Sequence, residues 1–396
     1  MSGNIKEYIK YIARGISPLY DNDGIVVLNQ KCIRNQKISL EESRIHNIHK
    51  KSVSEDKILQ NFDVLINSTG VGTLGRVAQV KNIKDKITVD SHITIVRPNL
   101  EKINGEFFGY CIKVQEDFIE TLGTGATGQT ELSRDAILDN VVIPHYSKEN
   151  QQKIAKILSN YDDLIENNNK RIKILEEMAQ KIYKEWFVNF NYPGHETATF
   201  KDTELGKIPS DWDVKTLNQC SKLFDNQRKP LSSLQRSNMK GVYPYYGAAK
   251  ILDYINDYIF EGKYLLLAED GSVITEEGYP VLQFVNGKFW ANNHTHIIQG
   301  IKNISTEFLY LSLAKYSIIR CITGAAQPKI NQENLNRIEL IIPNDNILIR
   351  FNNLISPIFD EIFLIEQKQK ILKQTRDLLL PRLMSSEIDI DKLEIV

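Results

Sequence analysis

Three glycines of this 396-residue chain have the spacing of a dinucleotide-binding loop. Gly70, Gly72 and Gly75 form G-x-G-x-x-G directly after an apolar run. Such a loop needs a helix behind it, whose N-terminus holds the pyrophosphate, and an acidic residue about 20 positions further on. The residues after Gly75 are instead spaced for strands, and Arg76 and Val77 replace the Lys and Ser or Thr of a P-loop. We therefore predict a turn between two strands and no nucleotide site.

Three histidines have the chemistry of metal ligands. His294 and His296 are two residues apart, so in a strand they point to one face, and His92 occupies a similar context earlier in the chain. Metal sites in proteins combine histidine with Cys or carboxylate ligands at short spacing, and neither accompanies these histidines. We predict hydrogen-bonded histidines that stabilise a loop, and no metal site.

The elements that position these residues occur twice. The segment 124-TGATGQTELSRDAILDNVVIP-144 aligns without a gap with 323-TGAAQPKINQENLNRIELIIP-343, and 64-VLINSTGVG-72 aligns with 265-LLLAEDGSV-273. Matching segments in the same order indicate an internal repeat, which sets the architecture of the whole chain.

The repeat also decides how an acidic pair is interpreted. Glu269 and Asp270 have the residue types of a catalytic acid–base pair, but they align with Ser68 and Thr69. A position that accepts either acids or hydroxyls is typical of a turn. We therefore predict no catalytic residues.

Each repeat ends in a long helix. Apolar residues recur in alternating steps of four and three, which is the pattern of a coiled coil. At about 1.5 Å per residue each helix is roughly 50 Å long. The positions in the first helix are Ile154, Leu158, Tyr161, Ile165, Asn168, Ile172, Leu175, Ala179, Ile182 and Trp186. Those in the second are Leu348, Phe351, Ile355, Ile358, Ile362, Ile365, Gln369, Leu372, Arg376, Leu379 and Leu383.

The two apolar seams most simply bury each other in an antiparallel pair. Alignment about the midpoints predicts three contacts: Asn168 with Gln369, Tyr161 with Arg376, and Trp186 with Phe351. The first would fix the register as a buried amide pair, and the second would be a cation–π contact. The two repeats would then lie at opposite ends of a rod, related by an approximate two-fold axis.

Composition sets further limits. Hydrophobic content of 42% and charged content of 25% are ordinary for a globular protein. No apolar run is long enough to span a membrane and no signal peptide is apparent, so we expect a cytoplasmic protein without a membrane partner. The four cysteines form no C-x-x-C pair, which argues against structural zinc or disulfides. The net charge of -1 offers no bulk attraction to nucleic acid, but it allows a local basic face.

Several stretches carry a family resemblance. The runs 161-YDDLIENNNKRIKILEEMAQKIYKEWFVNF-190, 204-ELGKIPSDWDVKTL-217 and 378-LLLPRLMSSEI-388 resemble the specificity (S) subunit of type I restriction-modification enzymes. So do 24-GIVVLNQKCI-33 and 241-GVYPYYGAAKILDYINDYIFEGKYLLLAEDGSV-273. One departure is the N-terminus, which lacks the G-x-I-P-x-x-W entry of the second repeat.

The resemblance implies an α+β fold with two similar αβ target-recognition domains joined by two long helices in an antiparallel coiled coil with pseudo-two-fold symmetry. The expected segments are a first target-recognition domain (1–147), a first coiled-coil helix (148–190), a linker (191–209), a second target-recognition domain (210–345), a second coiled-coil helix (346–385) and a C-terminal tail (386–396).

The resemblance also implies a non-catalytic subunit that recognises a bipartite, asymmetric site in double-stranded DNA. The expected partners are two modification subunits and two restriction subunits, with S-adenosylmethionine, ATP and Mg bound by those partners and no cofactor in this chain. Two other interpretations remain: an adaptor that only recruits proteins through its coiled coil, or a DNA methyltransferase or nuclease in its own right. Against an adenine methyltransferase, 191-NYPG-194 lacks the paired prolines of its catalytic loop.

Base reading needs directional donors and acceptors, and phosphate binding needs Lys or Arg. Polar and basic residues in loops of both repeats therefore become the candidates for DNA contact. In the first repeat they are Gln30, Lys31, Arg34, Asn35, Lys37, Arg76, Thr127 and Gln129. In the second they are Gln227, Arg228, Lys229, Tyr245, Tyr246, Gln327 and Lys329.

Overall fold

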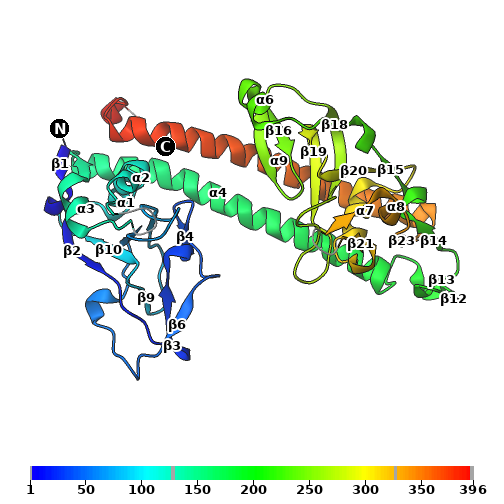
Figure 1. Cartoon of the computed structure of the whole chain (residues 1–396), viewed down its shortest axis with the longest axis horizontal. Coiled ribbons are helices and arrows are strands. Elements are labelled where there is room, and N and C mark those ends of the chain that lie inside the picture. Colours follow the sequence, from blue (N-terminus) through cyan, green and yellow to red (C-terminus); the bar gives the residue numbers. More distant parts are fainter. Residues whose placement is uncertain (1, 126–129, 325–327, 393–396) are drawn as a thin grey trace. The chain divides into compact units, whose positions relative to one another are not determined.

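The computed structural model describes residues 2–125, 130–324 and 328–392. The chain forms two compact units: unit 1 comprises residues 1–167 and 369–396, and unit 2 comprises residues 168–368. Two long helices, α4 (Lys148–Tyr183) and α9 (Asp345–Met384), each contribute one part to unit 1 and the other part to unit 2 (Figure 1). None of the described helices is both long and apolar enough to cross a membrane.

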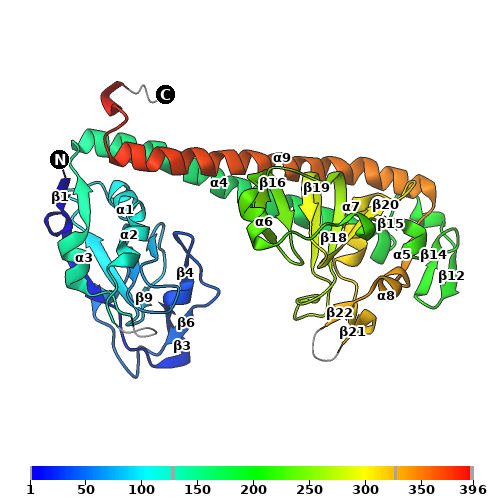
Figure 2. The ribbon, with the colours of Figure 1, turned by 45° about the horizontal axis from the view of Figure 1, so that its top comes forward.

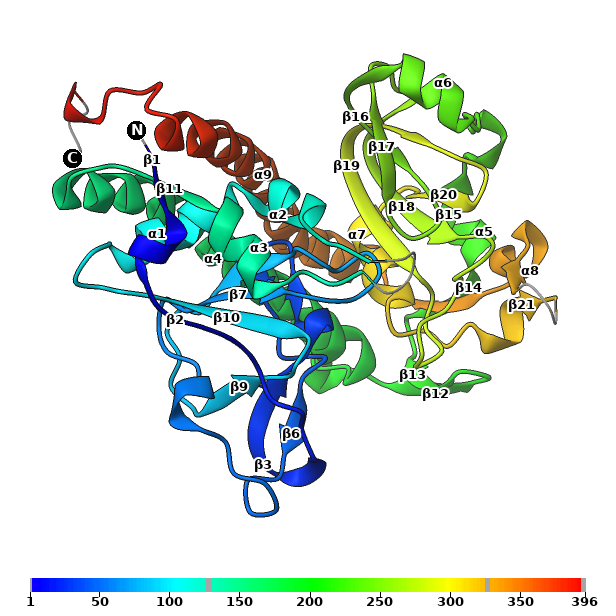
Figure 3. The same cartoon turned by 60° about the vertical axis from the view of Figure 1, so that its left-hand side comes forward.

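Unit 1 is built on a four-stranded antiparallel sheet. Its strands, in spatial order, are β2 (Ile9–Arg14), β10 (Ile93–Pro98), β7 (Val64–Asn67) and β8 (Val77–Gln79). The central strands β7 and β10 are buried along their whole length, which explains their apolar character. A second sheet has the order β6 (Arg44–His46), β3 (Tyr20–Leu28) and β9 (Ile87–Val89), and Figure 3 shows β3 and β6 side by side.

The remaining elements of unit 1 close its core. They are β1 (Ser2–Asn4), which pairs with β11 (Val142–Pro144), the hairpin β4 (Ile33–Arg34) and β5 (Lys37–Ile38), and the helices α1 (Gly105–Lys113), α2 (Glu116–Thr121) and α3 (Arg134–Asn140). Helix α1 is capped at its N-terminus by Asn104, whose side chain accepts a hydrogen bond from the backbone N–H of Phe107 at 2.9 Å.

Unit 2 contains the same four-stranded arrangement within a larger sheet of six strands. The order is β15 (Ser221–Leu223), β20 (Thr295–Gly300), β18 (Phe260–Ala268), β19 (Leu282–Ala291), β16 (Lys240–Tyr246) and β17 (Ile251–Ile255). Strand β16 runs parallel to the end of β19, as β3 runs parallel to β9 in unit 1. Strand β19 therefore continues where unit 1 has two separate strands, β8 and β9.

The smaller elements of unit 2 flank this sheet (Figure 2). They are the hairpin β12 (Phe200–Thr203) and β13 (Gly206–Pro209), the pair β14 (Asp213–Thr216) and β23 (Glu339–Ile342), the pair β21 (Ile322–Thr323) and β22 (Lys329–Ile330), and the helices α5 (Leu217–Cys220), α6 (Ser233–Asn238), α7 (Thr306–Leu313) and α8 (Gln332–Asn336). Unit 1 has no counterpart of the β12–β13 hairpin among its described residues, which is where the sequence lacks the G-x-I-P-x-x-W entry.

The long helices belong to the core of each unit. In unit 1, Leu158 of α4 and Leu383 of α9 are buried in one cluster with Phe108 of α1. In unit 2, Ala179 of α4 and Phe351 of α9 share a cluster with residues of α7. The predicted apolar seams are therefore buried both by the partner helix and by the domain beside it.

Within each unit the segments of α4 and α9 are antiparallel, as predicted. In unit 2, Arg171 bonds to Glu361 at 2.7 Å, and the rings of Trp186 and Phe351 lie 5.8 Å apart between centroids. The predicted Trp186–Phe351 contact is confirmed. In unit 1, the carboxamide of Gln369 donates to the carbonyl of Ile165 at 3.1 Å.

The predicted cation–π contact between Tyr161 and Arg376 is wrong. Arg376 Nη1 instead lies 2.7 Å from Oδ1 of Asp162, the next residue on α4, because a carboxylate is a stronger partner for guanidinium than an aromatic ring. Asn168 and Gln369 fall on opposite sides of the division between the units, and their pairing stays a prediction.

Candidate functional site

The glycine motif is a turn between antiparallel strands, as predicted. Residues 68–76 connect β7 to β8, and no helix follows. Gly70 has φ +108° and its aligned partner Gly271 has φ +77°, a region that favours glycine. The shared requirement is this backbone conformation, and the nucleotide-loop interpretation is excluded by the strand that follows.

Both turns are fixed by the same backbone hydrogen bonds. The N–H of Ser68 donates to the carbonyl of His92 at 2.8 Å, and the N–H of Glu269 donates to that of His294 at 2.9 Å. The carbonyl of Ser68 accepts from Leu132 at 2.8 Å, and the carbonyl of Glu269 accepts from Ile330 at 2.9 Å. The repeat inferred from sequence is thus a repeat of hydrogen bonding. We call these two places the strand-end sites. The site of unit 1 surrounds Ser68, His92 and Leu132, and the site of unit 2 surrounds Glu269, His294 and Ile330.

These bonds also correct part of the sequence alignment. Ser133 and Asn331 are the residues that cap helices α3 and α8, whereas the gapless alignment pairs Ser133 with Gln332. The reason is a compensated length difference: the capping residue lies nine positions after Thr124 but eight after Thr323, and the segment from the cap to the proline is one residue longer in the second repeat.

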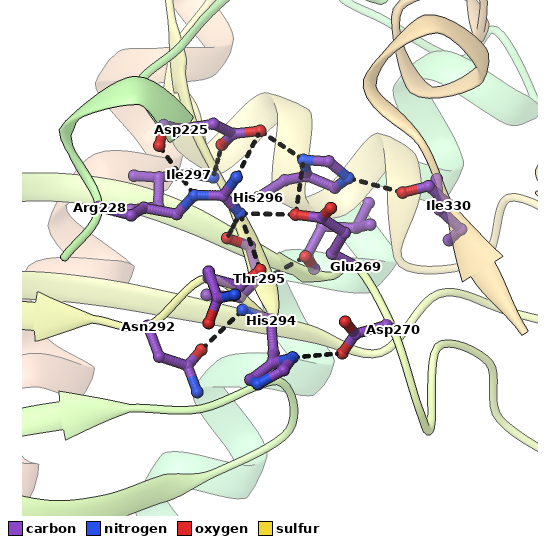
Figure 4. A network of polar contacts seen from close by, with 12 residues as sticks. Asp225, Arg228, Glu269, Asp270, Asn292, His294, Thr295, His296, Ile297 and Ile330 are labelled. Carbon is purple, nitrogen blue, oxygen red and sulfur yellow. Dashed lines mark hydrogen bonds and ion pairs between the residues drawn. The ribbon is translucent and has the colours of Figure 1, made fainter. Parts of the chain in front are cut away.

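The strand-end site of unit 2 is a network of charged groups (Figure 4). Arg228 Nη1 lies 2.6 Å from Oε2 of Glu269 and also donates to the carbonyl of Thr295 at 2.7 Å. His296 is buried, and its Nδ1 lies 2.6 Å from Oδ2 of Asp225. Its Nε2 lies 2.8 Å from the carbonyl of Ile330. Both ring nitrogens of His296 therefore face oxygen acceptors, a carboxylate on one side and a backbone carbonyl on the other.

The surrounding cations favour the ionised form of Glu269. Burial opposes ionisation of Glu269, but hydrogen bonds from Arg228 and Lys329 outweigh it, and the pKa of the carboxyl lies below its usual value. Lys329 Nζ is 3.1 Å from Oε1 of the same carboxylate. Since Lys329 stands at the start of β22, the network anchors the base of the loop that precedes it.

The same network contains a donor set of the kind that binds metal ions. Ligand atoms of Asp225, Glu269 and His296 lie within 4.8 Å of one another. The guanidinium of Arg228 already lies against both carboxylates, at 2.6 Å from Glu269 and 3.7 Å from Asp225. This internal cation supplies the charge that a metal would otherwise provide.

Sequence spacing missed this cluster. Asp225 and Glu269 are distant from His296 in the chain, and the fold brings them together. His294 and His296 were expected to share one face, but they separate: His294 is exposed and its Nδ1 lies 2.7 Å from Asp270. His294 precedes strand β20, so the alternation of a strand does not extend to it.

The strand-end site of unit 1 uses neutral groups at equivalent positions. The hydroxyl of Ser68 lies 2.5 Å from that of Thr94, where unit 2 has Glu269 and His296. Nδ1 of His92 lies 2.6 Å from the hydroxyl of Thr69, as His294 pairs with Asp270. Arg14 donates to the carbonyl of Leu132 at 3.0 Å and pairs with Glu131 at 2.7 Å.

The structure revises several candidates for DNA contact in unit 2. Gln227 and Lys229 are exposed beside the strand-end site, and Lys329 is exposed within it. Arg228 is not free to contact DNA, because its guanidinium is ion-paired with Glu269 and its side chain is only 14% exposed. Gln327 lies outside the described residues.

The tyrosines of β16 belong to the core more than to the surface. Tyr245 is 1% exposed, and its hydroxyl accepts a hydrogen bond from the N–H of Leu231 at 2.9 Å, so it cannot contact DNA. Tyr246 is half-buried, and burial raises the pKa of its hydroxyl. The motif Tyr-Pro-Tyr-Tyr gave no sign of which ring faces inward.

The candidates of unit 1 divide between two places. The carbonyl of Gln30 accepts from Asn67 at 3.0 Å, and Arg76 Nη2 donates to Gly72 at 2.7 Å, so both lie beside the glycine turn. Lys37 instead faces helix α4, where Nζ is 3.4 Å from Glu166. Lys31, Arg34 and Asn35 are exposed, as is Lys37, and Thr127 and Gln129 lie outside the described residues.

Comparison with known families identifies the repeat. The model of the type I restriction modification DNA specificity domain matches twice, over residues 7–177 and 209–374. The chain belongs to this family. Each match spans the recognition domain and most of the long helix that follows it, so the specificity subunit carries two copies of the domain.

Named relatives agree over most of the chain. The MjaIX specificity subunit of Methanocaldococcus jannaschii is 28% identical over 370 residues, covering 88% of this chain and 83% of that protein. The HindI specificity subunit of Haemophilus influenzae is 24% identical over 465 residues, covering 97% and 99%.

A solved structure shares the fold. The S subunit of a type I restriction-modification system from M. genitalium has a TM-score of 0.62 and 15% identity, covering 97% of this chain and 96% of that one. The α+β architecture with two recognition domains and two long helices is therefore the architecture of this family.

Proposed function

We propose that this specificity subunit recognises a bipartite, asymmetric sequence in double-stranded DNA, with one half-site read by each unit. Duplex DNA has local two-fold axes, so a chain with two similar reading domains fits a target in two half-sites. The two strand-end sites carry this proposal. They share one scaffold of backbone hydrogen bonds but present different side chains, Thr69 in unit 1 against Asp270 in unit 2, and they differ behind these at the buried Ser68 and at Glu269.

The exposed polar residues beside these sites supply the contacts. Lys31 and Arg34 of unit 1 and Lys229 of unit 2 have exposed cationic side chains for phosphates, and Gln227 has the amide that pairs with adenine. Because this chain has a net charge of -1, basic groups of the partner subunits supply part of the free energy of DNA binding.

The chemistry belongs to the partners in this proposal. Two modification subunits bind S-adenosylmethionine and methylate the target, and two restriction subunits use ATP and Mg to move and cleave DNA. The names of the relatives, all specificity subunits of type I restriction enzymes, support this division. Because the target is cellular DNA, we place the complex in the cytoplasm.

A domain exchange tests the proposal. Residues 1–147 are replaced by the corresponding domain of the Haemophilus influenzae HindI specificity subunit, and the methylated positions are mapped in cells that carry the modification subunit. One half-site is expected to change while the other is retained. The reciprocal exchange of residues 210–345 should alter only the other half-site. An unchanged target in a folded, assembled exchange variant would instead favour an adaptor without DNA reading of its own.

A further inference from the structure

Unit 1 contains a cavity that the DNA candidates Asn35 and Lys37 help to line. Its volume is about 560 Å³, within the range of sites that bind small molecules. The lining comes from the β4–β5 hairpin, the segment around Lys81, the end of α1 and the facing sides of α4 and α9. All of these residues belong to unit 1.

Lysine side chains converge on this cavity. Nζ of Lys113 lies 5.2 Å from the ring centroid of Tyr110, and Nζ of Lys81 lies 5.5 Å from the same centroid. Lys37 and Lys84 also line the cavity. Two amines over one ring repel each other, and the ring offsets only part of that repulsion.

The nearby carboxylates are already engaged. Asp162 accepts from the hydroxyl of Tyr110 at 2.7 Å and from Arg376 at 2.7 Å. Glu166 pairs with Lys37 at 3.4 Å. Asp85 and Asp163 line the cavity from exposed positions.

Of the two lysines that lie over Tyr110, Lys81 is 3.8 Å from Glu106, and Lys113 is the one without a carboxylate of its own. Among the described residues no acid forms an ion pair with it, although it is half-buried. Burial, followed by the positive charges of Lys81, Arg376 and Lys37, lowers the pKa of its amine to about 8, against the attraction of Asp162. An anion in the cavity would relieve this repulsion.

The rest of the lining is apolar. Leu28, Leu59 and Val80 are buried at the cavity wall, and Ile83 and Ile87 stand beside them. A bare anion would leave these side chains against water, whereas a ligand with an aromatic or apolar body would cover them. The cavity therefore combines a cationic part with an apolar part.

We propose that unit 1 binds a small phosphate-bearing molecule with an aromatic body, the chemistry of a nucleotide, with its phosphate on Lys113 and Lys81. This site is separate from the glycine turn, which the sequence first suggested for such a ligand. Because the cavity joins the β4–β5 hairpin to α4 and α9, an occupant would link Lys37 and Asn35 to the long helices.

Calorimetric titration of the full-length subunit with AMP, adenosine and inorganic phosphate tests the proposal. AMP is expected to bind more tightly than either fragment, since each covers one part of the cavity. Lys113→Met and Lys81→Met are expected to weaken AMP binding about tenfold or more, and Lys113→Arg less than threefold. Lys102→Met is the control, because Lys102 is an exposed lysine of unit 1 outside the cavity.

Amine-reactive labelling gives a second measurement that does not depend on a variant. At pH 8, Lys113 is expected to react faster than exposed lysines, and saturating AMP is expected to slow it about tenfold. Melting without ligand checks that Lys113→Met is folded. The proposal fails if AMP and phosphate neither release heat nor protect Lys113, or if Lys102→Met weakens binding equally. It also fails if only duplex DNA protects Lys113, since that result would assign the lysine to a DNA phosphate.

Discussion

Replacement of Arg228 by Met tests how unit 2 is stabilised. Arg228 and Glu269 are each 14% exposed and lie 2.6 Å apart, so their pair is largely shielded from solvent. Methionine keeps the apolar stem and removes the charge. Breaking a buried ion pair costs about 3–5 kcal/mol. Because Lys329 stays 3.1 Å from the same carboxylate, we expect the lower end, about 3 kcal/mol.

Tryptophan fluorescence makes the measurement specific to unit 2. The chain has 3 tryptophans, and Trp186, Trp212 and Trp290 all lie within residues 168–368. With a urea slope of about 2 kcal/mol per molar, a loss of about 3 kcal/mol lowers the unfolding midpoint by about 1.5 M. Lys229→Met, an exposed neighbour, should change stability by less than about 0.5 kcal/mol.

A double-mutant cycle isolates the pair itself. Glu269→Ser introduces the residue that unit 1 has at the equivalent position, Ser68. Combined with Arg228→Met, it removes both charges, so the double variant should be less destabilised than the sum of the single variants by about 1.5 kcal/mol or more. Additive effects, or a midpoint shift below about 0.3 M for Arg228→Met, would refute the reasoning.

Two further predictions concern single buried groups. Burial raises the pKa of Asp90, whose equivalent in unit 2 is Asn292, so the ionised carboxylate costs stability as pH rises through its folded-state pKa. Asp90→Asn should therefore be more stable than wild type at pH 8, with the difference shrinking towards pH 4 in thermal melts; an equal gain at both pH values would contradict this. Tyr245→Phe should cost about 1 kcal/mol in urea unfolding, for the lost bond to Leu231, and leave the recognised DNA sequence unchanged. A changed methylation target in that variant would return Tyr245 to the DNA surface.

Residue periodicity and the internal repeat predicted most of the fold. The steps of four and three predicted two long helices, observed as α4 and α9, and the repeat predicted the two glycine turns. Both signals can be read from the sequence without knowledge of tertiary contacts. The contacts between the two helices were predicted less well. Trp186 contacts Phe351 as predicted, but Arg376 pairs with Asp162 and not with Tyr161. Heptad positions specify which face of a helix is buried. They do not specify which of two adjacent residues a polar side chain contacts, because that depends on the chemistry of the side chains.

Tertiary contacts decided what the sequence could not. Arg228 was expected at the surface because it stands in a polar run, and its partner Glu269 is 41 positions away. The sequence does not indicate that Lys81 and Lys113 share a cavity, because each is an ordinary charged residue in its own segment. Such groups acquire their chemistry from neighbours that only the fold supplies.

The strand-end sites explain how one scaffold accommodates such different residues. The bonds that fix the turn run between backbone groups, which every residue type offers except for proline's missing N–H. Side chains at these positions then change as pairs: the hydroxyls of Ser68 and Thr94 in unit 1 correspond to Glu269 and His296 in unit 2. Introducing Glu269 alone at the position of Ser68 would bury a carboxylate without the Arg228 and Lys329 that pair with it in unit 2, which is far more costly than introducing the whole network. Each unit can therefore diverge at this site only by coupled changes, while its backbone geometry is preserved.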